Sequence, residues 1–382
     1  MMSEIRQRTI QNNDSIRMWG YSRESPNFRF KEKLTKSIEC TYGLCNSFDT
    51  FLSPRDNQPY ILYSNKGGAS NSTNIFIYSI KKKESKKLTP CIHMKELRLL
   101  KYFINIPKTR EYIISADCDG VLCIWPFKNS SKFFILQNKI TAVNQLDIYS
   151  CLILFKEDIN FTIEYDYLIF ACENIAEDDT TSAKIYSLNK GTFLKNMVNT
   201  FNEKIRYLLM WHNKKNNEHY LICLAMDKII FINFLKNQKE REITTKEKNT
   251  YNCGFIYSEN FNEESEKNYL CCTSSTGHIL VFELEEGIKI SDIFLRPNIH
   301  RIYDILPWNE NYFIVADTLD NGITILGFEK GGKIFLVSNI NGLDEDDIEC
   351  IRKINHPEYG ECIVTCSHSY LMKIFGYVSA KF

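Results

Sequence analysis

The stretch IPKTREYIISADCDGVLCIW, residues 106–125, decides the fold. An apolar run begins at Tyr112, a turn follows at Asp119 and Gly120, and a second, alternating run ends at Trp125. Short apolar runs separated by Gly, Asn or Asp are typical of antiparallel β-strands, and helical periodicity over a dozen residues is hard to find in the chain. These residues therefore predict two β-strands joined by a turn.

The same strand pair recurs along the chain as two tracks. The first track is an apolar run that opens on a tyrosine in six copies and on a cysteine in the seventh: Tyr60, Tyr112, Tyr167, Tyr220, Tyr269, Tyr312 and Cys362. The second is an alternating strand that ends on a bulky apolar residue: Tyr78, Trp125, Tyr186, Ile232, Phe282, Leu326 and Phe375. Because seven units recur and none can close a core alone, the sequence predicts stacked, repeated sheets.

Units of this length with about four strands each stack radially into a β-propeller. The chain resembles the WD-repeat family over roughly residues 28–382, best at residues 106–125 and in the last unit, INHPEYGECIVTCSHSYLMKIF, which keeps the turn from Pro357 to Gly360. The resemblance implies a His and an Asp that help to build a buried hydrogen-bond network in each blade. The family's Trp-Asp dipeptide is absent, and Gly-His is missing from its expected place. We therefore expect most blades to be held by apolar packing.

The expected fold class is all-β, a seven-bladed β-propeller of four-stranded antiparallel blades. The last unit leaves no residues for a fourth strand after Phe375, whereas residues 27–39, NFRFKEKLTKSIE, alternate like an edge strand. We predict that residues 26–39 pair beside the strand of Ile374 and Phe375 and close the ring, which removes two exposed sheet edges. Residues 26–382 are then one domain, and residues 1–25 are a flexible polar tail.

Composition excludes several classes of protein. The 382 residues are 44% hydrophobic and 13% aromatic, so the chain can bury a core, and 47 Lys and Arg balance 47 Asp and Glu. A net charge of zero argues against broad coating of nucleic acid. The N-terminus lacks the apolar stretch of a secretory signal, and the longest apolar runs are about as long as one strand. We expect an intracellular protein, cytoplasmic or nuclear, without a transmembrane segment.

No chemistry-bearing motif stands out. None of the 14 cysteines forms a Cys-x-x-Cys pair, and we interpret them as free thiols that act as small hydrophobes. His93 and Glu96 are interpreted as solvated residues of a connection, and the remaining histidines are dispersed. There is no nucleophile elbow, P-loop or His-Glu-x-x-His motif. The sequence predicts no enzyme, no metal and no cofactor.

Charged loops are the candidate binding residues. In the propeller topology, acidic loops at Ala176–Ser182 and Leu343–Glu349 fall on one face, and basic loops, led by Lys81–Lys87, fall on the other. The candidate partner-binding residues are Asp344, Glu345, Asp346, Asp347, Asp178, Asp179, Lys81, Lys82, Lys83, Lys86 and Lys87. The alternative interpretation is that these charges only keep the protein soluble.

The sequence favours a non-catalytic scaffold or adaptor for protein–protein interaction, a rigid subunit that is monomeric within a larger complex. One alternative is a subunit of an RNA-modifying or chromatin-associated complex that sets its basic loops against phosphate. This is less favoured, because Lys81–Lys87 contains no aromatic residue on which a base could stack. A second alternative is a peripheral membrane adaptor that binds anionic lipid.

Overall fold

The structure, a computed structural model, describes residues 30–37, 48–66, 72–90, 92–129, 133–141, 147–158, 165–173, 183–197, 204–244, 250–262, 265–295, 302–317, 321–367 and 371–377. Over these residues the chain folds into β-strands, with one 3-10 turn, η1 (Lys156–Asp158), and no α-helix. The predicted tail, residues 1–25, lies outside the described residues. The described residues form two compact units, within residues 36–246 and 354–358 (the N-terminal unit) and within 1–35, 247–353 and 359–382 (the C-terminal unit).

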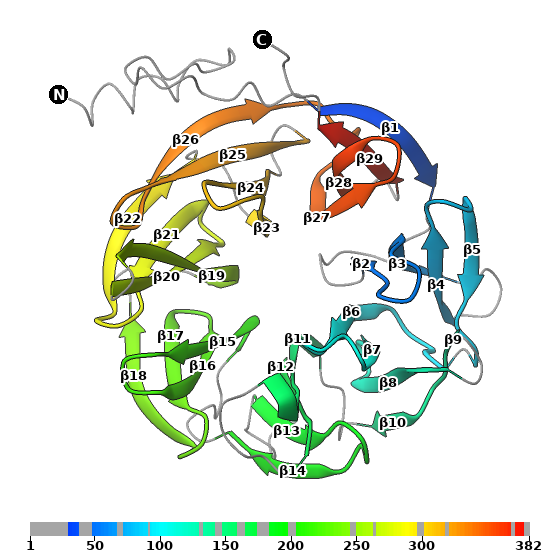
Figure 1. The fold of residues 1–382 in the computed structure, drawn as a ribbon, viewed down its shortest axis with the longest axis horizontal. Coiled ribbons are helices and arrows are strands. Elements are labelled where there is room, and N and C mark those ends of the chain that lie inside the picture. Colours follow the sequence, from blue (N-terminus) through cyan, green and yellow to red (C-terminus); the bar gives the residue numbers. More distant parts are fainter. Residues whose placement is uncertain are drawn as a thin grey trace. The chain divides into compact units, whose positions relative to one another are not determined.

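The N-terminal unit contains four antiparallel sheets, which are the first four blades (Figure 1). The first two blades comprise β2 (Phe48–Leu52), β3 (Pro59–Lys66), β4 (Thr73–Ser79) and β5 (Glu84–Lys87), then β6 (Leu97–Ile104), β7 (Glu111–Asp117), β8 (Val121–Lys128), β9 (Phe133–Phe134) and β10 (Asn138–Thr141). The next two comprise β11 (Asp147–Leu154), β12 (Tyr167–Glu173), β13 (Ala183–Ser187) and β14 (Phe193–Asn196), then β15 (Tyr207–Asn213), β16 (Glu218–Leu224), β17 (Lys228–Asn233) and β18 (Gln238–Thr244).

The C-terminal unit contains the fifth and sixth blades and most of the seventh. The fifth and sixth comprise β19 (Tyr251–Asn262), β20 (Ser265–Ser274), β21 (His278–Glu283) and β22 (Ile288–Phe294), then β23 (Ile302–Pro307), β24 (Tyr312–Asp317), β25 (Gly322–Glu329) and β26 (Lys333–Ile340). The seventh comprises β27 (Ile348–His356), β28 (Gly360–Ser367), β29 (Leu371–Tyr377) and β1 (Phe30–Ser37). Seven successive antiparallel sheets confirm the predicted all-β, seven-bladed β-propeller fold.

The predicted closing strand is present. The strand order of the seventh sheet is β1-β29-β28-β27, so the N-terminal strand β1 supplies the fourth strand beside β29 (Figure 1). The ammonium of Lys33 on β1 lies 4.8 Å from the ring centroid of Tyr359, next to β28. Pairing removes the free edge that β29 would otherwise expose. The prediction that residues 26–382 form one domain stays a prediction.

The two sequence tracks form the second and third strands of every blade, in one constant register. In each sheet the residue after the first-track position lies directly opposite the second-track residue. These cross-strand pairs are Ile61 with Tyr78, Ile113 with Trp125, Leu168 with Tyr186, Leu221 with Ile232, Leu270 with Phe282, Phe313 with Leu326 and Ile363 with Phe375. Facing apolar side chains stabilise a strand pair, so the repeat in sequence is a repeat of one apolar cross-strand contact.

The second blade departs from the four-stranded prediction because its outer strand is interrupted. β10 pairs with the first half of β8, and β9 pairs with its end, where Phe134 lies opposite Phe127. The residues between the two pairings include Leu136, which packs against the buried cluster around Phe134. The outer position of this blade is therefore filled by two short strands.

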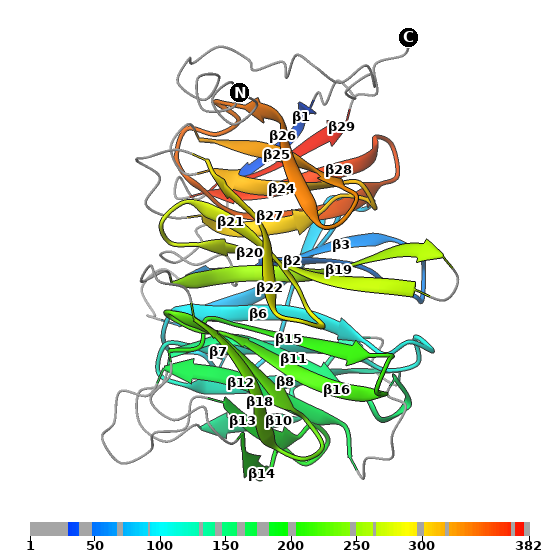
Figure 2. The same ribbon diagram turned by 90° about the vertical axis from the view of Figure 1, so that its left-hand side faces the viewer.

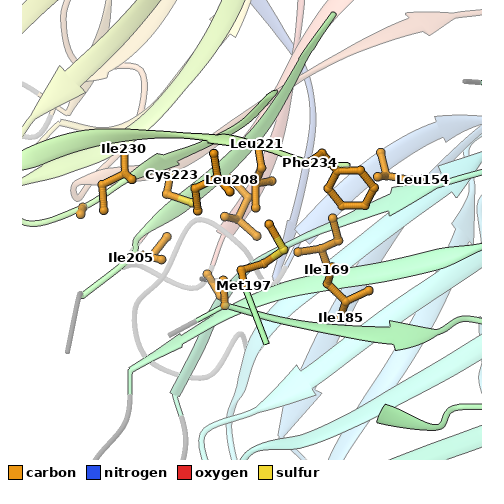
Figure 3. Packing of buried hydrophobic residues seen from close by; sticks show 14 residues of the cluster. Leu154, Ile169, Ile185, Met197, Ile205, Leu208, Leu221, Cys223, Ile230 and Phe234 are labelled. Carbon is orange, nitrogen blue, oxygen red and sulfur yellow. The ribbon is translucent and has the colours of Figure 1, made fainter. Parts of the chain in front are cut away.

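The apolar cores lie between neighbouring blades. In the N-terminal unit the first strands β6, β11 and β15 of three successive blades lie next to one another (Figure 2). Figure 3 shows the cluster between the third and fourth blades, in which Ile169 and Ile185 of one sheet pack with Leu221 and Phe234 of the next. An equivalent cluster joins the sixth and seventh blades around Ile325. The four clusters of the described residues, between the first and second, second and third, third and fourth, and sixth and seventh blades, each draw on two neighbouring sheets.

The prediction that His93 is solvated is wrong. Its ring is buried, with 1% of its surface exposed. Nδ1 lies 3.0 Å from Asp117 Oδ2, Nε2 lies 2.8 Å from Ser115 Oγ, and Trp125 Nε1 donates to the same hydroxyl at 2.9 Å. This is the kind of His–Asp network that the WD-repeat resemblance implies. Because Asp117, Ser115 and Trp125 lie on β7 and β8, the connection before β6 is fastened to its own blade.

Polar side chains on first strands also join blades through the main chain. In each case a side-chain oxygen accepts the N–H of a residue in the first strand of the following blade. The three pairs are Asp49 with Tyr102 at 2.9 Å, Ser150 with Leu208 at 3.2 Å, and Asp304 with Ile351 at 3.0 Å. These bonds occupy donors at the blade boundary that would be costly to bury without an acceptor.

Candidate functional site

The five lysines predicted to bind a partner lie on one hairpin. Lys81, Lys82 and Lys83 form the turn between β4 and β5, and Lys86 and Lys87 lie on β5 itself. All five are exposed, so this hairpin presents a concentrated positive charge at the outer edge of the first blade. We call it the basic hairpin. Its role in binding stays a prediction.

The predicted acidic loop needs one correction, at Asp344. The Asp344 side chain is fully buried, and its carboxylate lies 3.4 Å from Lys373 Nζ on β29. A carboxylate that is buried against Lys373 offers no charge to a partner. Glu345 and Asp346 are exposed and Asp347 is half-buried, so these three form the acidic surface. The predicted residues Asp178 and Asp179 lie outside the described residues.

A cavity of about 680 Å³ opens beside the basic hairpin, between the first and second blades of the N-terminal unit. Its lining combines cations, carboxylates and aromatic rings: Phe51, Arg55, Asp56, Tyr60, Ile77, Ser79, Lys82, Glu84, Ser85, Lys86, Phe127, Asn129, Phe133 and Phe134. We call this cavity the Arg55 pocket. It brings Lys82 and Lys86 of the prediction together with an arginine and aromatic residues that sequence reasoning did not single out.

Arg55 is held in place by the turn between β2 and β3. Within this turn the N–H of Ser53 donates to the carbonyl of Gln58 at 3.0 Å, and the N–H of Arg55 donates to Ser53 Oγ at 3.4 Å. The guanidinium carbon of Arg55 lies 3.4 Å from the ring centroid of Phe127. Its Nη1 donates to Glu111 Oε1 at 2.7 Å. The guanidinium of Arg55 therefore stacks on the second blade, although Arg55 itself belongs to the first blade.

The outer strand of the second blade supplies most of the aromatic wall. Phe133 and Phe134 come from β9, and the ring of Phe127 on β8 lies 5.5 Å from that of Phe134, edge to face. The ammonium of Lys86 lies 3.6 Å from the ring centroid of Phe133, which places the basic hairpin against β9. Cations over ring faces are attracted by the negative face of the ring. The interruption of the outer strand is therefore what creates this wall.

The carboxylate behind Arg55 is structural in character. Glu111 is buried at the start of β7 and accepts a hydrogen bond from the Tyr102 hydroxyl at 2.8 Å. Burial raises the pKa of Glu111, while the bond from Tyr102 and the charge of Arg55 act in the opposite direction. Burial and the bond to Glu111 raise the pKa of Tyr102. This pair of side chains fixes Arg55 without filling the pocket.

Tyr60 and Asp56 line another part of the pocket. The Tyr60 hydroxyl donates to Asp56 Oδ2 at 2.6 Å, and the N–H of Gln58 donates to Asp56 Oδ1 at 3.1 Å. Burial, followed by this hydrogen bond, raises the pKa of Tyr60 to about 12. The ring of Tyr60 stacks on Phe51, with centroids 5.3 Å apart. The Tyr60 phenol therefore stays neutral across the physiological range and adds no negative charge to the pocket.

A similar arrangement between the next two blades shows what signal could have found Glu111, the partner of Arg55. Arg110, at the end of the turn between β6 and β7, pairs with Asp166 and Glu157 and lies over the ring of Phe155. In both cases an arginine of one blade pairs with the acid directly before the first-track tyrosine of the next blade, Glu111 before Tyr112 and Asp166 before Tyr167. Comparing repeats would have aligned these two acids, whereas the two arginines and the aromatic wall lack a common repeat position.

The cysteines and potential metal ligands add no further site. The cysteines whose side chains the structure describes are free, and all of these but Cys118 are buried, which agrees with packing as small hydrophobes. Within the described ranges no group of three His, Cys, Asp or Glu side chains is arranged to hold a metal ion. The same ranges contain no helix long and apolar enough to cross a membrane.

Comparison with known proteins supports the fold. No family model and no curated protein matches the chain. Among solved structures, one of BBS1N in complex with ARL6DN, soaked with mercury, has a TM-score of 0.61 at 10% identity and covers 92% of this chain and 98% of that one. The lead-soaked form of the same complex has a TM-score of 0.58 at 8% identity, with the same coverage. The mitotic checkpoint complex contributes a chain with a TM-score of 0.63 at 8% identity, covering 94% of this chain and 98% of that one.

These similarities define the class of protein, a seven-bladed β-propeller, over nearly the whole chain. Each of the matching chains comes from a structure of a protein complex. Identities of this size carry the fold alone, and the resemblance to WD repeats remains one of sequence tracks and of the network around His93.

Proposed function

We propose that this propeller is a non-catalytic interaction subunit that holds other proteins together inside the cell, and that the Arg55 pocket is one of its partner-binding surfaces. Solved propellers of similar fold occur in complexes, BBS1N with ARL6DN and a chain of the mitotic checkpoint complex. The fold of these neighbours and their occurrence in complexes are consistent with a non-catalytic role for this chain. The fold defines the class of protein, whereas the pocket is the proposed surface at which a partner binds.

The observation that carries the proposal is the pocket itself. Its volume of about 680 Å³ is within the range of sites that bind ligands or side chains of a partner, roughly 300–1,000 Å³. Lys82 and Lys86 stand exposed at the pocket, and an aromatic wall lies beneath Lys86. Aromatic residues and arginine dominate the binding energy of protein interfaces. The acidic surface of Glu345, Asp346 and Asp347 is a second proposed contact.

The test compares two charge reversals of equal size. One variant carries Lys82→Glu and Lys86→Glu, and the control carries Lys214→Glu and Lys215→Glu in the exposed turn of the β15–β16 hairpin. Tagged full chains are purified from their own cells, and co-purifying proteins are quantified by mass spectrometry. We expect the pocket variant to lose a defined set of proteins that the control retains, and reconstitution with purified partner to reproduce the loss.

Three results contradict this function. Recovery of the same proteins with both variants would remove the pocket as a partner-binding surface. Partners that depend on nuclease-sensitive nucleic acid, with steep loss from heparin as salt rises, would favour the nucleic-acid alternative. Flotation with anionic liposomes that only the pocket variant loses would favour the membrane alternative.

A further inference from the structure

We propose that the occupant of the Arg55 pocket is an extended segment of a partner protein in which an aromatic or aliphatic side chain and a carboxylate lie two residues apart. This inference rests on the proposed function and names the chemistry of its partner. It follows from the charges that the pocket leaves unpaired, from the position of its aromatic wall and from the edge strand beside it.

The pocket has cationic hydrogen-bond donors that the fold leaves unused. Arg55 has five N–H donors, and the structure shows one of its nitrogens, Nη1, donating to Glu111. Within the described residues, neither Lys82 nor Lys86 forms an ion pair with a carboxylate. Asp56 already accepts hydrogen bonds from Tyr60 and Gln58. A carboxylate from a partner therefore finds donors that the fold has not used.

The aromatic wall lies close to these donors. The guanidinium carbon of Arg55 is 5.5 Å from the ring centroid of Phe134, and Phe133 and Phe127 are only half-buried. An apolar side chain placed against these rings brings its neighbours within reach of Arg55 or Lys86. In an extended chain the side chains two residues apart point to the same face and lie about 7 Å apart, at roughly 3.3 Å per residue. The cations lie 3.4–5.5 Å from the ring centroids, so two flexible side chains on one face of an extended segment can converge on the wall and on a cation.

A sheet edge beside the pocket favours an extended occupant. β5 is the terminal strand of the first blade, and all four of its residues are exposed. Glu84, Ser85 and Lys86 of β5 line the pocket. An exposed edge strand can pair with the main chain of an added strand, while pockets beside it select alternate side chains. Lysines on this edge discourage pairing with like-charged strands and favour an acidic one.

Nucleic acid fits this geometry less well. The carboxylates of Asp56 and Glu84 line the pocket, where they would repel a phosphate. A strand of nucleic acid brings one such charge with every nucleotide, whereas the proposed peptide brings a single carboxylate beside an apolar side chain.

The experiment measures binding of four fluorescein-labelled twelve-residue peptides to the full chain by fluorescence anisotropy. Their centres read Phe-Ser-Glu, the amide Phe-Ser-Gln, the truncated Ala-Ser-Glu and the shifted Phe-Ser-Ser-Glu, each between Gly-Ser flanks. We expect the first to bind most tightly. Each change is expected to weaken binding on the order of tenfold, because it removes a charge-assisted bond, the apolar anchor or the shared face.

Variants of the protein test whether the peptides bind in the Arg55 pocket. Lys82→Glu with Lys86→Glu is expected to weaken the Phe-Ser-Glu peptide at least about tenfold and to leave the amide peptide less affected, whereas Lys214→Glu with Lys215→Glu leaves both unchanged. The charge of Arg55 is not reversed in these variants, because loss of this arginine would leave the buried Glu111 without its cation. Phe133→Ala keeps every charge and is expected to weaken the Phe-Ser-Glu peptide but not the Ala-Ser-Glu peptide.

The inference is overturned if the Phe-Ser-Glu peptide does not bind, if the amide binds equally well, or if the pocket variant binds as the wild type does. Displacement of the peptide by a twelve-nucleotide single strand at lower concentration would also overturn it. If the pocket variant loses protein partners in cells while the amide peptide binds equally well, the proposed function stands and only the chemistry assigned to its partner fails.

Discussion

At the residue scale, the network around His93 joins a connection to the blade that follows it. Ser115 is its centre, because its hydroxyl lies within hydrogen-bonding distance of both His93 and Trp125. All of these side chains are buried. Removing one member leaves another buried polar group without its partner, which costs more than the bond itself contributes.

We expect Ser115→Ala and Trp125→Phe each to lower the free energy of unfolding by about 1–3 kcal/mol. The double variant is expected to lose less than the two losses combined, because both substitutions break the same bond. Urea unfolding followed by circular dichroism measures these values. The control Ser258→Ala removes an exposed serine hydroxyl that donates to Asn268 at 2.8 Å, and is expected to cost less than about 0.5 kcal/mol. Strict additivity of the two core substitutions would contradict the network.

His219 is expected to make the protein sensitive to acid. Burial lowers the pKa of His219 from 6.5 to about 4, and the charge of His212, whose ring stacks at 4.3 Å, acts in the same direction. Between pH 6.5 and pH 4 the unfolded chain therefore binds more protons than the folded chain. Stability from this group is complete above pH 6.5 and is lost as the pH falls through that window, by on the order of 2 kcal/mol.

Denaturation in urea at pH 7.5 and pH 4.5 tests this. His219→Phe keeps an aromatic ring against His212 but cannot be protonated, so the variant is expected to lose less stability between the two pH values than the wild type. Equal losses in both proteins would show that other groups cause the acid sensitivity.

Single residues mark the limit of sequence reasoning. The exposed lysines of the basic hairpin could be predicted, because a polar run between two strands has only a turn to occupy. The burial of Asp344 could not, because it depends on Lys373, which is remote in sequence. The burial of His93 could not be predicted for the same reason: its partners Ser115 and Asp117 lie on β7, 22 and 24 residues further along the chain.

At the element scale, β1 is an edge strand, so successive N–H groups of its main chain point alternately toward β29 and away from the sheet. Proline removes one N–H donor, so its cost depends on which way that donor points. We expect that, of Leu34→Pro and Thr35→Pro, one variant is strongly destabilised and the other is tolerated. Thermal unfolding measures the difference, and each variant is the control for the other. Similar melting of both variants and wild type would contradict the role of β1 in the seventh blade.

The elements predicted best are those that are buried on both sides. The second and third strands of each blade could be read from apolar runs, since their side chains must fill both interblade cores. The outer strands β5, β14, β18 and β22 contain no buried residue, so burial imposes little pattern on their sequences. The division of the second blade's outer strand into β9 and β10 could not be predicted, and it supplies the aromatic wall of the Arg55 pocket.

At the scale of the whole molecule, buried cysteines report on cooperativity. Cys123 and Cys223 lie in the N-terminal unit, and Cys271 and Cys362 lie in the C-terminal unit; all four are buried, whereas Cys118 is half-buried. Burial raises the pKa of the Cys123 and Cys271 thiols, which further slows their alkylation. Since the described apolar clusters each join two neighbouring blades, we expect the buried thiols to become reactive together.

Pulsed alkylation at increasing urea concentration, read by peptide mass spectrometry, measures this. Cys118 is expected to react in the native protein, and the four buried thiols at one common urea concentration. Two separate transitions that divide the thiols by unit would mean that the prediction of one domain over residues 26–382 is wrong.

The fold as a whole was the most predictable property, because seven copies of one contact reinforce a single interpretation. The Arg55 pocket was the least predictable. Its walls come from the β2–β3 turn, the basic hairpin and β9, which no spacing in the sequence connects. Repeats specify what the blades share, whereas a binding surface depends on where one blade differs.

Pairing of β1 with β29 has a consequence for synthesis on the ribosome. Translation delivers β1 first and β29 last, at roughly 5–20 residues per second, so β1 waits for tens of seconds before its partner emerges. During that interval β1 has no partner strand. A chaperone, or another chain made on the same polysome, can bind it. Emergence of β29, rather than the folding of any early blade, therefore sets the moment at which β1 can pair and the seventh blade can be completed.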